Sequence, residues 1–131
     1  MTRFEIVSAV LDQEMAKPYR YGSADCFFLG LRMATAFGHK GLITRYRRRY
    51  TTLRGAQRAL RKVGHKTLAT FFAALLAPCA PAMARIGDIG IVQIGNAEHV
   101  AICLGARWIT KTERGPATHD ITAVTAAFRA G

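Results

Sequence analysis

Residues 86–112 read IGDIGIVQIGNAEHVAICLGARWITKT, and this stretch decides the fold class. Apolar and β-branched residues alternate with other residues, and glycines stand between the runs, which is the pattern of short strands. The stretch predicts three antiparallel strands in a meander. Gly105-Ala106 is the expected tight turn between the second and third strands.

The chain begins with the signals of a helix. Thr2 and Glu5 have the spacing of a capping box, and apolar residues follow at helical spacing as far as Met15. Pro18 cannot continue a helix, and it disfavours a helical conformation of the residue before it. The sequence therefore predicts an N-terminal helix that ends before Pro18.

Three further helices are expected before the meander and one after it. A basic and irregular stretch at 39–50 separates the first two of these helices. A cap at Thr122 predicts a short C-terminal helix through Phe128. The helices before the meander are expected from Asp25 or Cys26 to Gly38, from Thr51 or Thr52 to Gly64, and from Thr67 to Pro78. Helices followed by a meander indicate an α+β domain in which N-terminal helices pack on a small antiparallel sheet. Its expected parts are 1–84, mainly helical, 85–112, the meander, and 118–131, a C-terminal segment.

Length and composition fit one globular domain. The 131 residues are 50% hydrophobic and 21% charged, and the three cysteines are too few and too scattered for a disulfide framework. No run reaches the roughly 18 apolar residues of a membrane span. Acidic residues interrupt the N-terminal stretch, which disfavours a signal peptide. We expect synthesis in the cytoplasm without export, and no membrane span.

The charge is high and local. Nineteen Lys and Arg residues against eight Asp and Glu give a formal net charge of +11, and no acidic residue lies between Asp25 and Asp88. Most of the cations in that interval fall in residues 40–66, called the basic segment below. Such a field favours a nucleic acid, an acidic protein surface or an anionic cell-wall polymer as partner. The alternative is a solvated basic face that only keeps the protein soluble.

Cys26 is the candidate nucleophile. It follows a glycine-containing loop and stands in the first turn of an expected helix, where free N–H groups and the helix dipole favour a thiolate. Cys79 lies between two prolines and Cys103 lies in an expected strand, so neither has this support. We expect Cys26 to be the only cysteine with a depressed pKa. The alternative is a small buried residue at the start of a core helix.

His99 is the candidate general base. Strand alternation places it on the opposite face from Val100, Ile102 and Leu104, which are expected to point into the core. It can take a proton from Cys26 if the fold brings the two residues together. The alternative is an ordinary histidine at the end of a strand.

Three motifs together resemble the NlpC/P60 superfamily of papain-like cysteine peptidases. They are PYRYGSADC at 18–26, GDI at 87–89 and HVAICLG at 99–105, and they occur in the order of that family's pattern. YRRRY at 46–50 and RGAQRAL at 54–60 resemble a compact phage and prophage branch.

The resemblance implies a papain-like fold and amide hydrolysis. Cys26 would attack the carbonyl carbon, and His99 would take and return the proton. The Cys26 N–H and Tyr19, which matches the family's loop tyrosine, would line the oxyanion hole. The substrate would be a peptidoglycan stem peptide, and a phage protein of this kind would sit at the tail hub or tip.

Two departures from the family pattern bear on catalysis. Phe27 and Phe28 follow Cys26 where the family has small residues, so a bulkier pocket floor is expected. The family's third catalytic residue falls on Thr110, which should share a face of the sheet with His99. A threonine orients an imidazole less firmly than an amide or a carboxylate does.

Other sites have weaker support. The four histidines and three cysteines lack metal-ligand spacing, so no metal or cofactor is expected. The aromatic residues at the ends of 46–50 leave single-stranded nucleic acid as a possible partner. The leading hypothesis is a phage tail-associated cysteine peptidase or amidase. The alternatives are a structural tail-tip or assembly protein with weak or no catalysis, and a nucleic-acid-binding module that uses the basic segment.

Overall fold

The computed structural model describes residues 1–131 and contains five α-helices and a six-stranded sheet. The helices are α1 (Arg3–Met15), α2 (Cys26–Ala36), α3 (Leu42–Tyr46), α4 (Leu53–Lys62) and α5 (Leu68–Leu75). The strands are β1 (Pro78–Cys79), β2 (Ile89–Ile94), β3 (Ala97–Cys103), β4 (Trp108–Thr112), β5 (Gly115–His119) and β6 (Val124–Phe128), with 3-10 turns η1 (Pro81–Met83) and η2 (Ile121–Ala123). All neighbouring strands are antiparallel, in the order β1-β6-β2-β3-β4-β5. The α+β class is confirmed.

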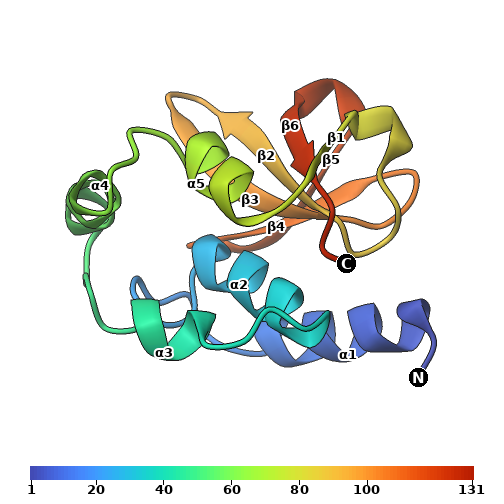
Figure 1. The fold of residues 1–131 in the computed structure, drawn as a ribbon, viewed down its shortest axis with the longest axis horizontal. Coiled ribbons are helices and arrows are strands. Elements are labelled where there is room, and N and C mark those ends of the chain that lie inside the picture. Colours follow the sequence, from blue (N-terminus) through green and yellow to red (C-terminus); the bar gives the residue numbers. More distant parts are fainter.

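The sheet lies above a layer formed by α1, α2 and α3, while α5 lies against the sheet beside β3 (Figure 1). The larger hydrophobic core fills the space between these helices and the sheet, and α2 contributes most to it. Gly30 of α2 permits a close approach, because a Cβ atom there would lie 2.7 Å from Val100 Cγ1 of β3. The start of α2 is thereby held near the middle of the sheet.

The other face of the sheet buries a second, smaller cluster. It contains Val92, Ala101, Cys103, Trp108 and Ala127. The Trp108 ring lies over the backbone at position 90, where a Cβ atom would be 2.5 Å from the ring, so the site requires glycine. The central part of β3 is therefore buried on both faces.

Most of the expected elements are confirmed. The meander is formed by β2, β3 and β4, and its tight turn closes with a bond from the Leu104 N–H to the Arg107 carbonyl at 2.7 Å. The N-caps of α1, α2, α4 and α5 each accept a backbone N–H with a side-chain oxygen. No helix combines the length and the apolar character needed to cross a membrane.

The expected C-terminal helix is wrong. Residues 124–128 form β6, which pairs with β2, and only the turn η2 remains of the helix. A short apolar run does not distinguish a strand from a buried helix by its period alone. The open edge of β2 decides here, because pairing with it satisfies the backbone groups of this run. Strand β5 at 115–119 and helix α3 at 42–46 were also missed.

A buried carboxylate joins the two ends of the chain to the sheet. Asp88 is fully buried just before β2. Its Oδ1 accepts bonds from Arg3 Nη2 at 2.8 Å and from the Ala130 N–H at 3.0 Å. Its Oδ2 accepts bonds from the Arg85 N–H at 2.8 Å and from Arg129 Nη1 at 3.1 Å. Four donors therefore compensate the desolvation of this charge.

We expect Asp88→Asn to lower the free energy of unfolding by roughly 3 kcal/mol, because the amide removes the negative charge and replaces one of the two acceptor oxygens with an NH2 group that faces two donors. Urea unfolding followed by circular dichroism measures the change. The matched control is Asp120→Asn at an exposed site, which should be neutral within about 0.5 kcal/mol. Equal stability of the two variants would contradict the assigned role of Asp88.

Candidate functional site

The loop before α2 is closed by the carboxylate of Asp25, which is 3% exposed. Oδ1 accepts the Phe28 N–H at 3.0 Å and caps the helix. Oδ2 accepts the Gly22 N–H at 3.1 Å and the Tyr50 hydroxyl at 2.6 Å. Burial and the charge of Asp25 raise the pKa of Tyr50, so its hydroxyl remains a donor. One side chain thus positions the loop, the helix and the end of segment 46–50.

Gly22 allows this arrangement. Its φ of +91° favours glycine, and a Cβ atom there would lie 2.1 Å from the Tyr50 carbonyl oxygen. The Gly22 carbonyl accepts the Arg48 N–H at 3.0 Å. The basic segment is therefore attached by its backbone to the loop that precedes Cys26.

The Cys26 sulfur is inserted where β3 and β4 separate. The paired residues of the two strands end at Ala101 and Thr110, so Val100 has no partner on β4. The Val100 N–H points to Cys26 Sγ at 3.5 Å, and the Thr110 hydroxyl donates to the Val100 carbonyl at 2.6 Å. Two side chains thus replace the missing ladder hydrogen bonds.

Burial, together with a smaller effect of the charge of Asp25, raises the pKa of the Cys26 thiol to about 11. The bonds from the Val100 N–H and from the Tyr19 hydroxyl, at 3.9 Å, act in the opposite direction but do not prevail. The prediction that Cys26 has a depressed pKa is therefore wrong. Cys26 does stand in the first turn of α2, but with 7% exposure the loss of water outweighs the helix dipole.

His99 makes no hydrogen bond with Cys26, although the Cys26 sulfur lies 3.5 Å from the backbone N of Val100, the next residue. Alternation along β3 places Glu98 and Val100 on the face of the helices, where Glu98 Oε1 accepts the Leu68 N–H at 2.8 Å. The His99 side chain lies on the other face of β3, beside Val92, the residue of β2 with which it is paired. Burial lowers the pKa of His99, and its Nδ1 is buried without a partner.

The remaining expected residues are placed as follows. Thr110 lies on the same face as His99, as the register predicted, but its hydroxyl is used by the Val100 carbonyl. Phe28 is fully buried in the core, and Phe27 packs on Phe71 with ring centroids 5.1 Å apart, so neither forms a pocket floor. No group of three or more metal-ligating side chains is present.

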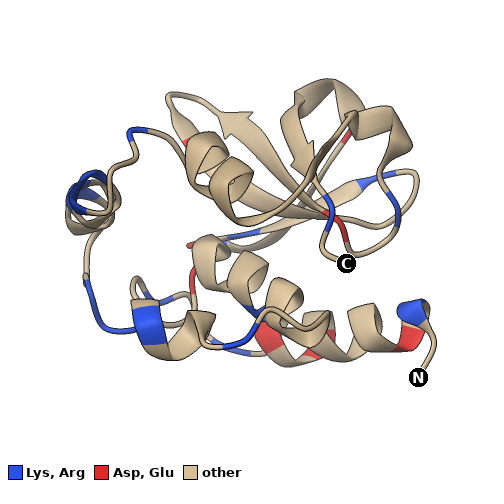
Figure 2. Ribbon diagram, viewed as in Figure 1, with Lys and Arg blue, Asp and Glu red and all other residues tan.

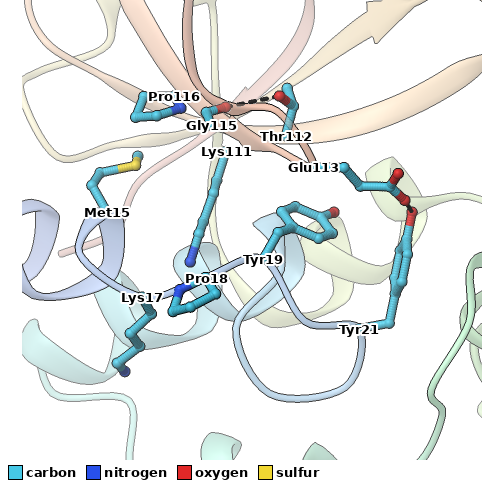
Figure 3. Close-up of a pocket in the computed structure, with 10 residues that line it drawn as sticks. All are labelled: Met15, Lys17, Pro18, Tyr19, Tyr21, Lys111, Thr112, Glu113, Gly115 and Pro116. Carbon is cyan, nitrogen blue, oxygen red and sulfur yellow. Dashed lines mark hydrogen bonds between the residues drawn. The ribbon is translucent and has the colours of Figure 1, made fainter.

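A cleft of about 590 Å³ opens beside this region (Figure 3). Tyr19 lines it, so one residue links the cleft to the Cys26 sulfur. The Tyr21 hydroxyl donates to Glu113 Oε1 at 2.6 Å and joins the loop to the β4–β5 hairpin. The cleft is lined by Met15, Lys17, Pro18, Tyr19, Tyr21, Lys111, Thr112, Glu113, Gly115 and Pro116.

Lys111, which was not predicted as a site residue, is only 3% exposed although it carries a charge. A usable signal was present. Lys111 follows Ile109 by two residues in the same strand, so alternation places both side chains on the helix-facing side of the sheet. A lysine at such a position is rarely buried without a partner.

A family model described as Domain of unknown function (DUF6950) matches residues 2–130. No curated protein matches the chain, and no solved structure matches it. The matched range includes Cys26, Asp25 and every residue that lines the cleft.

We expect iodoacetamide to modify the half-exposed Cys79 before Cys26 in the native protein at pH 8. Burial raises the pKa of both thiols, but that of Cys26 rises to about 11, and the deep burial of Cys26 also restricts access to its sulfur. Peptide mass spectrometry after timed labelling measures the order, with urea-unfolded protein as the control. First modification of Cys26 in the native protein would show that the sulfur is open and activated.

Proposed function

We propose that this chain, which belongs to the DUF6950 family, is a docking protein of a phage tail tip that keeps a papain-like NlpC/P60 fold without efficient catalysis. The observation that carries the proposal is the unneutralised charge of the basic segment. It contains ten Lys and Arg residues and no acidic residue. The ion pairs of the protein involve only Arg3, Lys17, Arg32 and Arg129, so none of the ten is paired.

The basic segment lies at one end of the molecule. Figure 2 shows Lys and Arg on α3, on α4 and on the connection between them, with no Asp or Glu there. Helix α4 stands away from the sheet, and none of its residues is buried (Figure 1). A protruding cationic surface of this kind fits an acidic protein surface, which would supply the missing counter-charges.

Helix α4 also carries an apolar strip. Leu53 and Val63 are 48% and 49% exposed, and helical spacing places them on the side of Leu60, opposite Arg54 and Arg58. Because the strip and these arginines lie on opposite sides of α4, and Leu60 packs against the core of the protein, a docking partner is expected to bind the arginine side of the helix.

The geometry around Cys26 favours docking over hydrolysis. A general base must be within hydrogen-bond reach of the proton that it removes, but no hydrogen bond joins His99 to Cys26, and burial raises the pKa of the Cys26 thiol. The position in the tail and the NlpC/P60 fold rest on the resemblance of residues 18–26, 87–89 and 99–105 to that family. The start of α2 at Cys26, packed on β3, supports the same assignment.

We expect the double variant Arg54→Glu with Arg58→Glu to weaken binding to poly-L-glutamate roughly tenfold at low salt, a change of about 1.4 kcal/mol. The control is Arg107→Glu with Arg114→Glu, which alters the net charge equally at exposed sites outside the basic segment. Fluorescence anisotropy at two salt concentrations measures both. Equal losses in the two variants would show that only the net charge matters.

In purified tail particles, the wild type and the control variant should be retained and the α4 variant lost. A 20-base-pair DNA duplex bound more tightly than poly-L-glutamate at the same salt would favour the nucleic-acid-binding module instead.

A second candidate is a cysteine hydrolase of peptidoglycan peptides. One observation favours it, the Tyr19 hydroxyl directed at Cys26 Sγ at the edge of the cleft. Activity would require the sulfur to become exposed and a base to approach it. His99 precedes Val100 in β3, and its ring would have to be directed toward the sulfur to supply that base.

We expect no release of soluble muropeptides from cell-wall sacculi by the isolated protein, because the Cys26 thiol is buried and protonated and makes no hydrogen bond with His99. Cys26→Ala serves as the matched control, and chromatography of the supernatant measures release. Release by the wild type that is absent in Cys26→Ala would establish the hydrolase.

A further inference from the structure

Lys111 is a buried cation whose hydrogen bonds are incomplete. Its ammonium group donates to the Glu14 carbonyl oxygen at 2.8 Å, and this is its only hydrogen bond. An ammonium group has three N–H donors, so two are left without a protein acceptor. Burial lowers the pKa of Lys111, as expected for a charge that its surroundings solvate poorly.

The carboxylate nearest to this site is already used. Glu14 is 1% exposed, and its Oε2 and Oε1 atoms pair with Lys17 Nζ at 2.6 Å and with Arg32 Nε at 2.9 Å. Two cations therefore share that one anion, and the charge of Lys111 comes in addition. The charge of Asp25 also acts on Lys111, but the Asp25 oxygens are occupied by Gly22, Phe28 and Tyr50, so no carboxylate of the protein accepts a hydrogen bond from Lys111.

Lys111 also lines the cleft described above. Figure 3 shows Lys111 and Lys17 toward one side, with Glu113 and Tyr21 toward the other and Tyr19 between them. Tyr19, Pro18, Pro116 and Met15 supply apolar surface along the same cleft. A volume of about 590 Å³ is within the range of small-molecule sites.

We propose that this cleft binds a small ligand with a free carboxylate and an apolar body, and that Lys111 is the residue that holds the carboxylate. The carboxylate accepts the two free N–H donors of Lys111 and neutralises its charge in a place largely closed to water, where such bonds are strong. The rings of Tyr19 and Tyr21 and the two prolines contact the apolar body. The site is separate from the basic segment and does not depend on the docking function.

The test compares N-acetyl-phenylalanine with N-acetyl-phenylalanine amide, which have nearly the same shape and differ in the charge of one group. We titrate each into ¹⁵N-labelled protein and follow the backbone amide signals. The carboxylate should give saturable shifts around residues 17–21 and 111–115 and bind at least tenfold more tightly than the amide. Equal affinities, or shifts confined to the basic segment, would overturn the proposal.

Variants assign the role to Lys111. Lys111→Met keeps the length of the side chain and should weaken carboxylate binding at least tenfold. Lys17→Met at the edge of the cleft should have a smaller effect, and Arg54→Glu with Arg58→Glu should have none. If Lys111→Met is less stable but binds the carboxylate as the wild type does, Lys111 only caps the end of α1 and the proposal fails. Should that variant not fold, the comparison of the two ligands on the wild type still decides.

A third ligand tests the chemical class. Inorganic phosphate at the same pH carries negative charge but no apolar body. It should bind more weakly than N-acetyl-phenylalanine, and equal or tighter binding would overturn the assignment of an apolar carboxylate.

Discussion

The arrangement of the site depends on one buried carboxylate, that of Asp25. A charge with 3% exposure is stable only when donors replace its water, and here two backbone N–H groups and the Tyr50 hydroxyl do so. These three bonds hold the loop, the first turn of α2 and the end of segment 46–50 in one place. The position of Cys26, the next residue, follows from them, and the Cys26 sulfur reaches the gap between β3 and β4.

The same packing explains why a residue in a position suited to a nucleophile is a closed thiol. A helix N-terminus favours a thiolate, but this effect acts strongly only while water or an opposite charge also solvates the sulfur. At Cys26 the water is excluded, and the nearest charge is the negative charge of Asp25. Desolvation and like charge act in the same direction, and two weak donors do not compensate for them.

The acidic residues of this protein serve mainly inside it. Buried Glu14 pairs with two cations, and buried Asp25 caps the start of α2. Buried Asp88 binds residues at both chain ends, and Glu98 accepts an N–H at the start of α5. Few acids remain to neutralise the surface, so the net charge of +11 falls largely on α3, α4 and their connections. The burial of acids and the basic surface are thus two results of the same distribution of charge.

The sequence alone determined the elements whose signals are local. The alternation in residues 86–112 predicted β2, β3 and β4, and side-chain caps predicted the starts of α1, α2, α4 and α5, because strand period and capping depend on residues close together in the chain. The placement of Cys26 in the first turn of a helix was predicted for the same reason.

Only the tertiary structure decided the features that depend on distant residues. Residues 124–128 became a strand because the edge of β2 was open to them, and Cys26 lost its expected acidity because the packing of α2 on the sheet removes its sulfur from water. The faces of His99, Val100 and Ile102 were predictable from alternation, whereas the depth at which α2 buries the Cys26 sulfur was not. Local patterns fix conformation and periodicity, but burial, and with it every pKa in the interior, is set by which surfaces meet when the chain folds.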